Sequence, residues 1–202
     1  MRVDKAAKLD QIKAELEALT ESPLYDYRTA NQYHVVPGEG SPDAKILFIG
    51  EAPGEKEAQS GRPFVGRAGK DLDALLERNG LGRQDVFITN IVKDRPPANR
   101  APSRVEIKLY TPFLVRQIEI IQPRIIATLG RFSMAFALSH FALPGKGQMI
   151  GDIHGEAFRA KAAFGPLTVF PLYHPAAVFY NRKLEPELEA DFAELVALAR
   201  GQ

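Results

Sequence analysis

Side chains that can do chemistry follow three apolar runs of this 202-residue chain. The run Ile46–Ile49 leads into a Gly-Glu-Ala-Pro-Gly turn that carries Glu51, and such a turn brings backbone and a carboxylate close to a ligand. Two later apolar runs lead to Asn90 and to His174. Ligands of open α/β sheets bind outside the carboxyl ends of the strands. These positions therefore predict a shared pocket in which an acid, an amide and an imidazole meet.

A second group of chemically useful residues is a basic, proline-rich stretch after Asn90. Residues 93–104 hold four basic side chains and one acidic one. The formal net charge of the chain is only +1, so contact with a nucleic acid must come from a local patch of this kind. A phosphate-binding surface is one interpretation of the stretch, and an ordinary solvated loop is the other.

The elements that must position these residues alternate between strands and helices. Strands are predicted at Ile46–Ile49, Val86–Thr89, Arg124–Leu129 and Leu167–Leu172, and helices over residues 4–19, 66–79, 103–121, 131–138 and 184–199. This alternation predicts an α/β fold, a three-layer α/β/α sandwich with a central four-stranded, mainly parallel sheet. Residues 1–202 are expected to form one domain, in which residues 1–35 are an N-terminal helix and an irregular lead-in.

Local signals refine these boundaries. Ser103 and Glu106 form a capping box that starts the third helix, and Pro112 is expected to kink or restart it. Residues 20–43 are expected to be irregular. Residues 141–164 are expected to form a hairpin or a long loop.

The composition excludes several functions. The chain has no cysteine, which rules out a disulfide, a thiolate metal site and a cysteine-ligated iron–sulfur cluster. It starts without an apolar leader and has no apolar run long enough to span a bilayer. We therefore expect a cytoplasmic, monomeric protein with no membrane contact, no metal and no cofactor.

Taken together, the motifs resemble those of the family 4 uracil-DNA glycosylases, within the wider uracil-DNA glycosylase superfamily. The resemblance runs from Val36 to the final helix. Its motifs are Gly50-Glu51-Ala52-Pro53-Gly54 with Glu57, Gly61–Gly69, Thr89-Asn90, Arg95–Arg100 and His174-Pro175. The resemblance implies a DNA repair hydrolase that flips uracil out of single- or double-stranded DNA and hydrolyses its N-glycosidic bond. The product would be an abasic site, as in base excision repair.

The resemblance also assigns roles to the ring, the amide and the imidazole. Phe64 is the platform on which the flipped base stacks, and an ordinary core phenylalanine is the alternative. Asn90 reads the O4 acceptor and the N3–H donor of uracil, and its alternative is to satisfy backbone at a strand end. His174 donates a hydrogen bond to uracil O2, on which negative charge grows as the glycosidic bond breaks.

The acidic residues complete this pocket by resemblance. Glu51 lies beside the sugar and the attacking water, where a carboxylate stabilises oxocarbenium-like charge or orients the water. Glu57 shapes the wall near uracil C5 and helps to exclude thymine, and Gly50 and Ala52 belong to the same uracil-binding turn. The best-known branch of the superfamily has an aspartate at the place of Ala52, so a largely dissociative cleavage without a dedicated general base is expected here.

Contacts with DNA are expected from two segments. The phosphate contacts implied by the resemblance are Arg62, Arg67, Lys93, Arg95, Arg100, Ser103 and Arg104. The loop after His174, made of Pro175, Ala176, Ala177 and Val178, resembles a segment that wedges into the duplex. Phe179 either joins this wedge or anchors the last helix.

One feature of the family is missing. Family 4 enzymes typically hold a [4Fe–4S] cluster on four cysteines, and two of those positions are Asp94 and Tyr110 in this chain. The earlier pair falls within residues 19–26, which also hold no cysteine. We expect aromatic packing to replace the cluster, with Tyr25, Tyr27 or Tyr33 against Tyr110. We also expect Asp94 to pair with a nearby arginine.

Three rival functions remain open from the sequence. A glycosylase for further deaminated bases, hypoxanthine or xanthine, would fit the room left by Gly54. A non-catalytic protein of the same fold that binds uracil or single-stranded DNA would not need Glu51, Asn90 and His174 together. A nucleotide-binding α/β protein would need a phosphate-binding glycine motif of a kind that the chain lacks.

Overall fold

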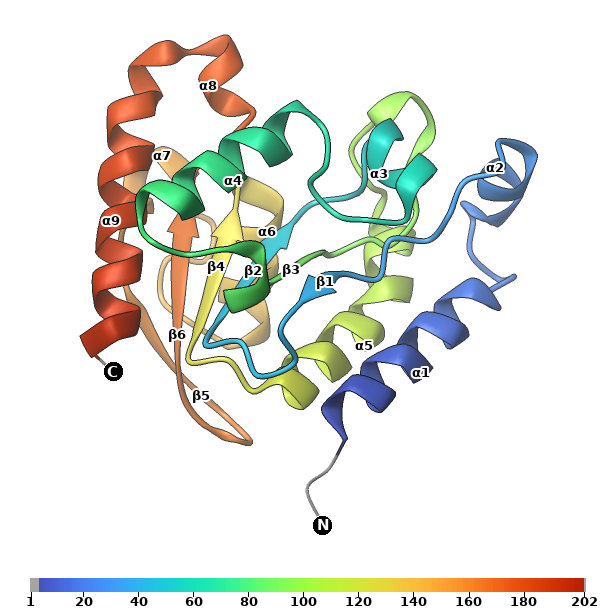
Figure 1. The fold of residues 1–202 in the computed structure, drawn as a ribbon, viewed down its shortest axis with the longest axis horizontal. Coiled ribbons are helices and arrows are strands. Elements are labelled where there is room, and N and C mark those ends of the chain that lie inside the picture. The colour runs from blue at the N-terminus through green and yellow to red at the C-terminus, as the bar shows by residue number, and fades with distance from the viewer. Residues whose placement is uncertain (1–3, 202) are drawn as a thin grey trace.

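The four apolar runs predicted as strands form the centre of a sheet in the computed structural model, which describes residues 4–201 (Figure 1). They are β2 (Ile46–Gly50), β3 (Phe87–Asn90), β4 (Ile125–Leu129) and β6 (Gly165–Leu172). β3 pairs with β2, β2 with β4 and β4 with β6, and each pair is parallel. Their residues are mostly buried, as parallel strands are when helices cover both faces.

Within the described residues the sheet has six strands rather than the four predicted, in the order β1-β3-β2-β4-β6-β5. β1 (Glu39–Gly40) runs antiparallel to β3, and β5 (Phe158–Ala162) runs antiparallel to β6. β1 is too short to give a sequence pattern. β5 alternates half-buried with exposed residues and forms a hairpin with β6, so the segment left open as a hairpin or a loop contains an edge strand.

All five predicted helices are present. They are α1 (Lys5–Glu17), α4 (Arg67–Arg78), α5 (Arg104–Ile121), α6 (Arg131–His140) and α9 (Glu185–Gly201). Within residues 4–201, four shorter α-helices lie in segments where no helix was predicted: α2 (Tyr25–Ala30), α3 (Glu55–Ser60), α7 (Ile150–Ile153) and α8 (Ala177–Tyr180). None of the helices described here is long and apolar enough to cross a bilayer.

The start of α5 follows its sequence signal. Ser103 Oγ accepts the Glu106 backbone N–H at 3.2 Å, and the Glu106 carboxylate accepts the Ser103 N–H at 2.7 Å. Pro112 does not restart the helix, which continues to Ile121. Buried contacts of Leu114 and Ile118 after the proline hold this second half of α5 in place.

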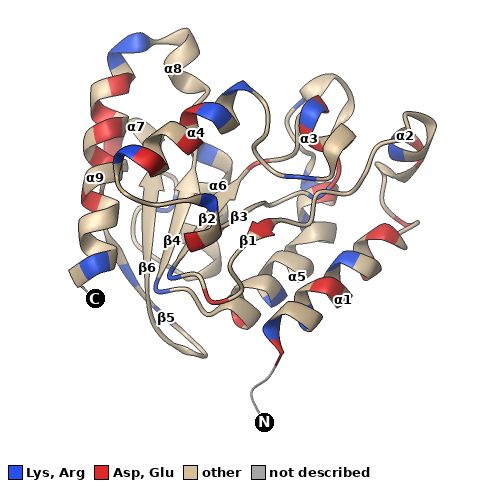
Figure 2. Ribbon diagram, in the orientation of Figure 1, with Lys and Arg blue, Asp and Glu red and all other residues tan. Residues whose placement is uncertain are grey.

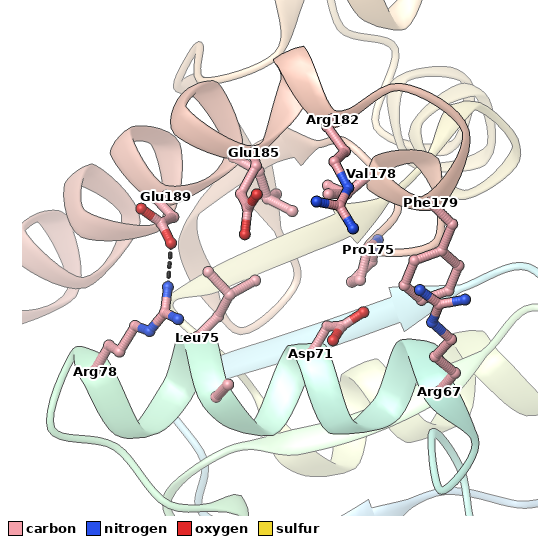
Figure 3. A pocket seen from close by; sticks show the side chains of 12 residues that line it. Arg67, Asp71, Leu75, Arg78, Pro175, Val178, Phe179, Arg182, Glu185 and Glu189 are labelled. Atoms are coloured by element: carbon pink, nitrogen blue, oxygen red, sulfur yellow. Dashed lines mark hydrogen bonds and ion pairs between the residues drawn. The ribbon is translucent and has the colours of Figure 1, made fainter.

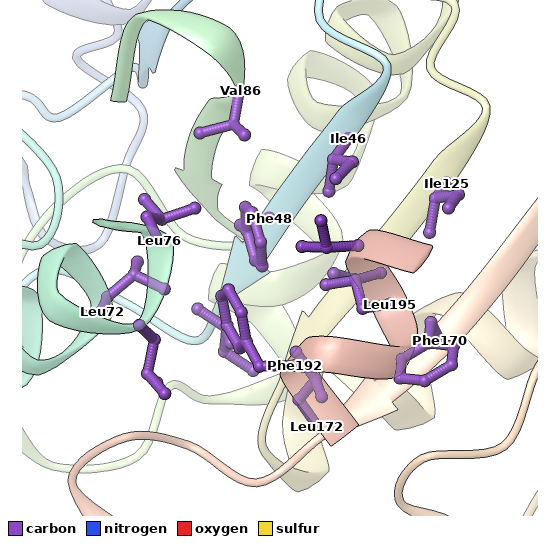
Figure 4. Packing of buried hydrophobic residues seen from close by; sticks show 14 of the residues in the cluster. Ile46, Phe48, Leu72, Leu76, Val86, Ile125, Phe170, Leu172, Phe192 and Leu195 are labelled. Carbon is purple, nitrogen blue, oxygen red and sulfur yellow. The ribbon is translucent and has the colours of Figure 1, made fainter. Parts of the chain in front are cut away.

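Two apolar layers flank the sheet, which confirms the three-layer architecture. On one face α4 and α9 pack on the strands, and Phe48 of β2 stacks on Phe192 of α9 with ring centroids 5.5 Å apart (Figure 4). On the other face α1 and α5 cover the neighbouring β2 residues Leu47 and Ile49. Because its alternate side chains enter opposite layers, β2 is fixed from both sides up to Gly50, its last residue.

Candidate active site

A pocket of about 510 Å³ opens at the carboxyl ends of β2, β3 and β6. Three of the sequence-predicted residues enter it from these ends: Glu51 follows β2, Asn90 ends β3, and His174 follows β6. The remaining lining residues are Ala52, Pro53, Gly54, Glu57, Phe64, Gly66, Arg67, Ala68, Pro96, Asn99, Arg100, Ala176 and Tyr180. The structure therefore brings an acid, an amide, an imidazole and an aromatic ring to one hollow.

Asn90 presents an amide with unused hydrogen-bonding capacity. The residue is only 2% exposed, yet no described residue hydrogen-bonds its side-chain amide. Its neighbour across the parallel pair is Gly50. A Cβ atom on Gly50 would lie 2.3 Å from Asn90 Oδ1 and 2.7 Å from Phe64 Cζ, so only glycine leaves both groups in place. The amide is thus available as one donor and one acceptor for a ligand.

The Phe64 ring is held by its loop rather than by a regular element. Its backbone is left-handed, with φ of 51°, which is uncommon for a phenylalanine. Glu57 Oε1 accepts the backbone N–H groups of Val65 at 2.8 Å and Gly66 at 2.7 Å. Arg83 Nη1 donates to the Phe64 carbonyl at 3.0 Å. Glu57 therefore lines the pocket and also braces the strained turn that aims the ring.

The loop also needs a close approach of α4. A Cβ atom on Gly69 would lie 1.8 Å from the Phe64 carbonyl oxygen. No side chain fits there, so glycine is required where the first turn of α4 meets the loop. Phe64 is 6% exposed, belongs to the hydrophobic core on the α4 side and also lines the pocket, so its position is compatible with either interpretation of this ring.

His174 is held as a neutral donor. Burial lowers the pKa of its imidazole to about 4, against a weaker opposing effect of the Glu57 charge. Its Nδ1 accepts the Ala176 backbone N–H at 3.1 Å, so the single proton of the neutral ring is on Nε2. The ring stacks on Phe64 with centroids 5.7 Å apart. These contacts leave Nε2–H as the group that His174 offers to a ligand in the pocket.

Glu51 supplies a carboxylate without a fixed partner. It is half-buried, and burial raises its pKa, which the charge of Arg131 partly offsets. Within residues 4–201 its carboxylate makes no hydrogen bond, whereas one oxygen of Glu57 is fully used by backbone. Both oxygens of Glu51 are therefore available to accept a hydrogen bond or a proton from a bound molecule, whereas Glu57 already uses one of its two.

The prediction that Lys93 contacts DNA is wrong. The residue is completely buried, with 0% exposure, and cannot reach a phosphate. Arg95 is largely engaged as well: its side chain is 9% exposed and donates to Tyr33 Oη at 2.6 Å and to Asn99 Oδ1 at 2.8 Å. Their position in a basic stretch suggested a surface role, but the loop turns both side chains inward.

The other predicted phosphate contacts lie on the surface. Arg62 forms a bidentate ion pair with Glu39, and Arg100 forms one with Glu106. Arg67, Ser103 and Arg104 are exposed. Basic positions at the start of α4 and between α8 and α9 lie on the side of the molecule where the parallel strands end (Figure 2). Cationic groups therefore lie on the same side of the molecule as the pocket, which Arg67 and Arg100 line, although some are already paired with carboxylates.

A second hollow of about 310 Å³ lies beside the first, between α4 and the α8–α9 segment (Figure 3). Arg67 lines both hollows, and its guanidinium lies 3.8 Å from the centroid of the Phe179 ring. Across the far end, Arg78 pairs with Glu189. Phe179 therefore packs against the Arg67 side chain of α4.

The loop predicted to wedge into the duplex is only partly exposed to solvent. Pro175 is buried, Ala176 and Ala177 are half-buried, and Val178 packs against the core. Tyr180, which the sequence analysis did not single out, is 91% exposed at the mouth of the pocket. An aromatic residue directly after the loop was the signal that could have found it. Tyr180 presents the freest stacking surface of this segment.

A buried polar network connects Asp94 of the basic stretch to α5 and to the N-terminal lead-in. Tyr110 Oη donates to Asp94 at 2.5 Å, and Ser22 Oγ lies 2.6 Å from the same Tyr110 oxygen. Arg28 Nη1 lies 3.2 Å from both oxygens of Asp94 and also donates to the Leu16 carbonyl at 3.1 Å. The predicted pairing of Asp94 with an arginine is confirmed. The partner of Tyr110 from the lead-in is Ser22, however, not Tyr25, Tyr27 or Tyr33, so the aromatic packing prediction is wrong.

This network does not fit an iron–sulfur cluster. Such clusters are held by thiolates, and the chain has none. Asp94 and Tyr110, the two residues that the resemblance places at cluster positions, are both 0% exposed and bonded to each other. Burial is the largest influence on Asp94 and raises its pKa, while Tyr110 and Arg28 lower it. Burial likewise raises the pKa of Tyr110, which stays a hydrogen-bond donor.

The fold and the pocket define the chain as an α/β protein with a pocket at the carboxyl ends of its parallel strands. The model of the uracil DNA glycosylase superfamily matches residues 37–197. The type-4 uracil-DNA glycosylase of Sulfurisphaera tokodaii is 46% identical over 95% of this chain and 84% of its own length. The enzymes of the same name from Saccharolobus solfataricus (45%, over 93% and 84%) and Archaeoglobus fulgidus (40%, over 93% and 91%) are similar. The chain belongs to the uracil DNA glycosylase superfamily, which confirms the family resemblance.

Proposed function

We propose that this chain is a uracil-DNA glycosylase, which hydrolyses the bond between uracil and deoxyribose in DNA and leaves an abasic site for repair. Membership of the superfamily and relatives named type-4 uracil-DNA glycosylases support this proposal. The structural observation that carries it is the buried, unpartnered amide of Asn90 in one pocket with the neutral imidazole of His174. We further propose that the enzyme works as a monomer, without a metal or a cluster.

Recognition of the base rests on Asn90 and Phe64. An amide donates to uracil O4 and accepts from N3–H, whereas cytosine presents the opposite pattern. Extruding the nucleotide costs a few kcal/mol, least in single strands and mismatches. Stacking of the base on an aromatic ring returns roughly 1–3 kcal/mol. We therefore expect action on single-stranded DNA and on duplexes, with the exposed basic groups and Tyr180 contacting the rest of the strand.

Cleavage is helped mainly at the leaving group. As the C1′–N1 bond breaks, its electron pair moves onto the uracil ring, and His174 Nε2–H stabilises the charge on O2. Glu51 faces the positive charge that develops on the sugar and orients the water whose oxygen bonds to C1′. The water loses a proton to the solvent as this bond forms, and the departing uracil anion takes up one proton, so the net reaction adds water across the C1′–N1 bond. A neutral donor suits this role, because it adds a hydrogen bond without first needing to be charged at physiological pH.

Release of uracil from a single-stranded oligonucleotide is the direct test. Asn90→Ala should lower the single-turnover rate by about 10²-fold or more, because each hydrogen bond lost to a buried polar group costs about 1–3 kcal/mol. Asn31→Ala, the same change in an exposed residue of the lead-in, should leave the rate unchanged. Hypoxanthine and xanthine substrates would reveal a broader enzyme. Binding of uracil-containing DNA by the wild type with no base release would instead identify a binding protein.

Gly50→Ala provides a steric test of the same pocket. The added methyl group would overlap Asn90 Oδ1 and the Phe64 ring edge, at 2.3 and 2.7 Å. Displacement by about 1 Å can cost on the order of 10²-fold in rate, and we expect a loss of that size. Gly151→Ala, where a Cβ atom would meet its nearest neighbour at 3.6 Å, is the matched control. An unchanged rate in Gly50→Ala would show that the two groups do not act on the base.

A further inference from the structure

Lys93 is the most deeply buried cation of the described residues that forms no ion pair. It is 0% exposed, and burial lowers the pKa of its amine far below the ordinary range. Its Nζ atom donates to the backbone carbonyl of Asn90 at 2.7 Å, to Thr89 Oγ1 at 2.6 Å and to Gln117 Oε1 at 2.7 Å. A buried charge without a counter-ion is costly, so its retention needs a reason.

The hydrogen-bond pattern around Lys93 calls for three donated hydrogens. Thr89 Oγ1 uses its own hydrogen on the Pro37 carbonyl, at 2.8 Å, and therefore accepts from Lys93. Gln117 Nε2 also donates to that carbonyl, at 2.8 Å, which leaves Oε1 as the acceptor toward Lys93. The Asn90 carbonyl can only accept. An ammonium group donates to all three acceptors, whereas a neutral amine has only two hydrogens, so these bonds favour the charged form against the effect of burial, which lowers the pKa of the amine.

The hydrogen bond from Lys93 Nζ to the Asn90 carbonyl restrains the backbone of a residue that lines the pocket. The side-chain amide of Asn90 has no hydrogen bond of its own to a described residue, so its orientation depends on its backbone and on packing against Gly50. Lys93 is absent from the pocket lining but fixes that backbone by its bond to the Asn90 carbonyl. Through Thr89 and Gln117 it joins Asn90 to Pro37, which precedes β1. The contact therefore restricts the residue that must distinguish uracil from cytosine.

We propose that Lys93 is a positioning residue for base recognition: its ammonium group holds Asn90 in register with the base. The inference rests on the proposed uracil-DNA glycosylase function.

Lys93→Met tests the proposal, since methionine keeps the length of the side chain and removes the ammonium group. The single-turnover rate of uracil release should fall by about 10²-fold, while the Kd for uracil-containing DNA changes by less than about 3-fold. Lys8→Met, a change of an exposed lysine, is the control and should leave both values unchanged. A rate for Lys93→Met within about 2-fold of wild type would overturn the proposal. A wild type that releases no uracil would instead overturn the proposed function.

A double-mutant cycle separates positioning from a general effect on folding. If Lys93 acts through Asn90, Lys93→Met should cost less than about 3-fold when Asn90 is already alanine. The same large loss in both backgrounds would show a merely structural role and overturn the proposal. Lys93→Gln, whose amide still donates two hydrogens, should fold more readily and keep more of the rate than methionine does. If Lys93→Met folds, a Lys93→Gln rate at or below the Lys93→Met rate would contradict the assigned role. If Lys93→Met does not fold, a Lys93→Gln rate equal to that of the wild type would contradict it.

Discussion

His174→Ala is expected to lower the single-turnover rate of uracil release by about 10²–10³-fold, with little change in DNA affinity. The imidazole offers one hydrogen, on Nε2, because its Nδ1 is occupied by the Ala176 N–H at 3.1 Å. The hydrogen bond from Nε2–H to uracil O2 becomes stronger as O2 becomes negative. Loss of this hydrogen bond therefore destabilises the transition state more than the bound substrate. Separate measurement of the single-turnover rate and of Kd distinguishes the two effects.

The pH profile gives this prediction a second readout. The pKa of His174 is lowered to about 4, so we expect no inflection from this group near its ordinary value of 6.5. As the pH falls toward 4, the ring gains a proton on Nδ1 and loses the Ala176 contact, and the rate should fall. His140→Ala, a change of an exposed histidine, should leave the profile unchanged. Full activity of His174→Ala would remove the leaving-group role assigned here.

The central strands were predictable because they are apolar runs that end in polar residues. β2, β3, β4 and β6 each stand out in this way, and the positions of Asn90 and His174 at strand ends then follow from the topology of parallel sheets. β1 was not predictable as a strand, and β5 lies in the segment left open as a hairpin or a long loop. β1 has two residues, and β5 lies at an edge where polar residues alternate with small ones.

The burial and the hydrogen-bond partners of individual side chains depend on residues far away in the sequence. Lys93 lies among arginines in the sequence, and its burial depends on Gln117 and Pro37, which are 24 and 56 residues away. Ser22 contacts Tyr110 from 88 residues away, so the composition could exclude a cluster but could not identify its replacement. Contacts between residues this far apart in the sequence are determined by tertiary packing, which the periodicity and composition of the sequence do not reveal.

Asp94→Ala is expected to lower the free energy of unfolding by about 3–5 kcal/mol, the largest stability effect that the structure suggests. The change leaves the guanidinium of Arg28, which is 6% exposed, without its carboxylate, and leaves Tyr110 Oη without its acceptor. Urea denaturation near neutral pH measures the loss. Glu189→Ala breaks the exposed pair with Arg78 and should cost less than about 1 kcal/mol, which makes it the matched control.

The double variant Arg28→Met with Asp94→Ala shows whether the network stabilises the fold or only avoids a penalty. Burial is the largest influence on the pKa of Asp94 and opposes its charged form, so the pair itself contributes little net stability. Removing both charges should therefore recover much of the loss seen in Asp94→Ala, although the bond between Ser22 and Tyr110 alone must then join the lead-in to α5. A double variant no more stable than the single one would mean that the ion pair, in place of a cluster, actively holds these segments together.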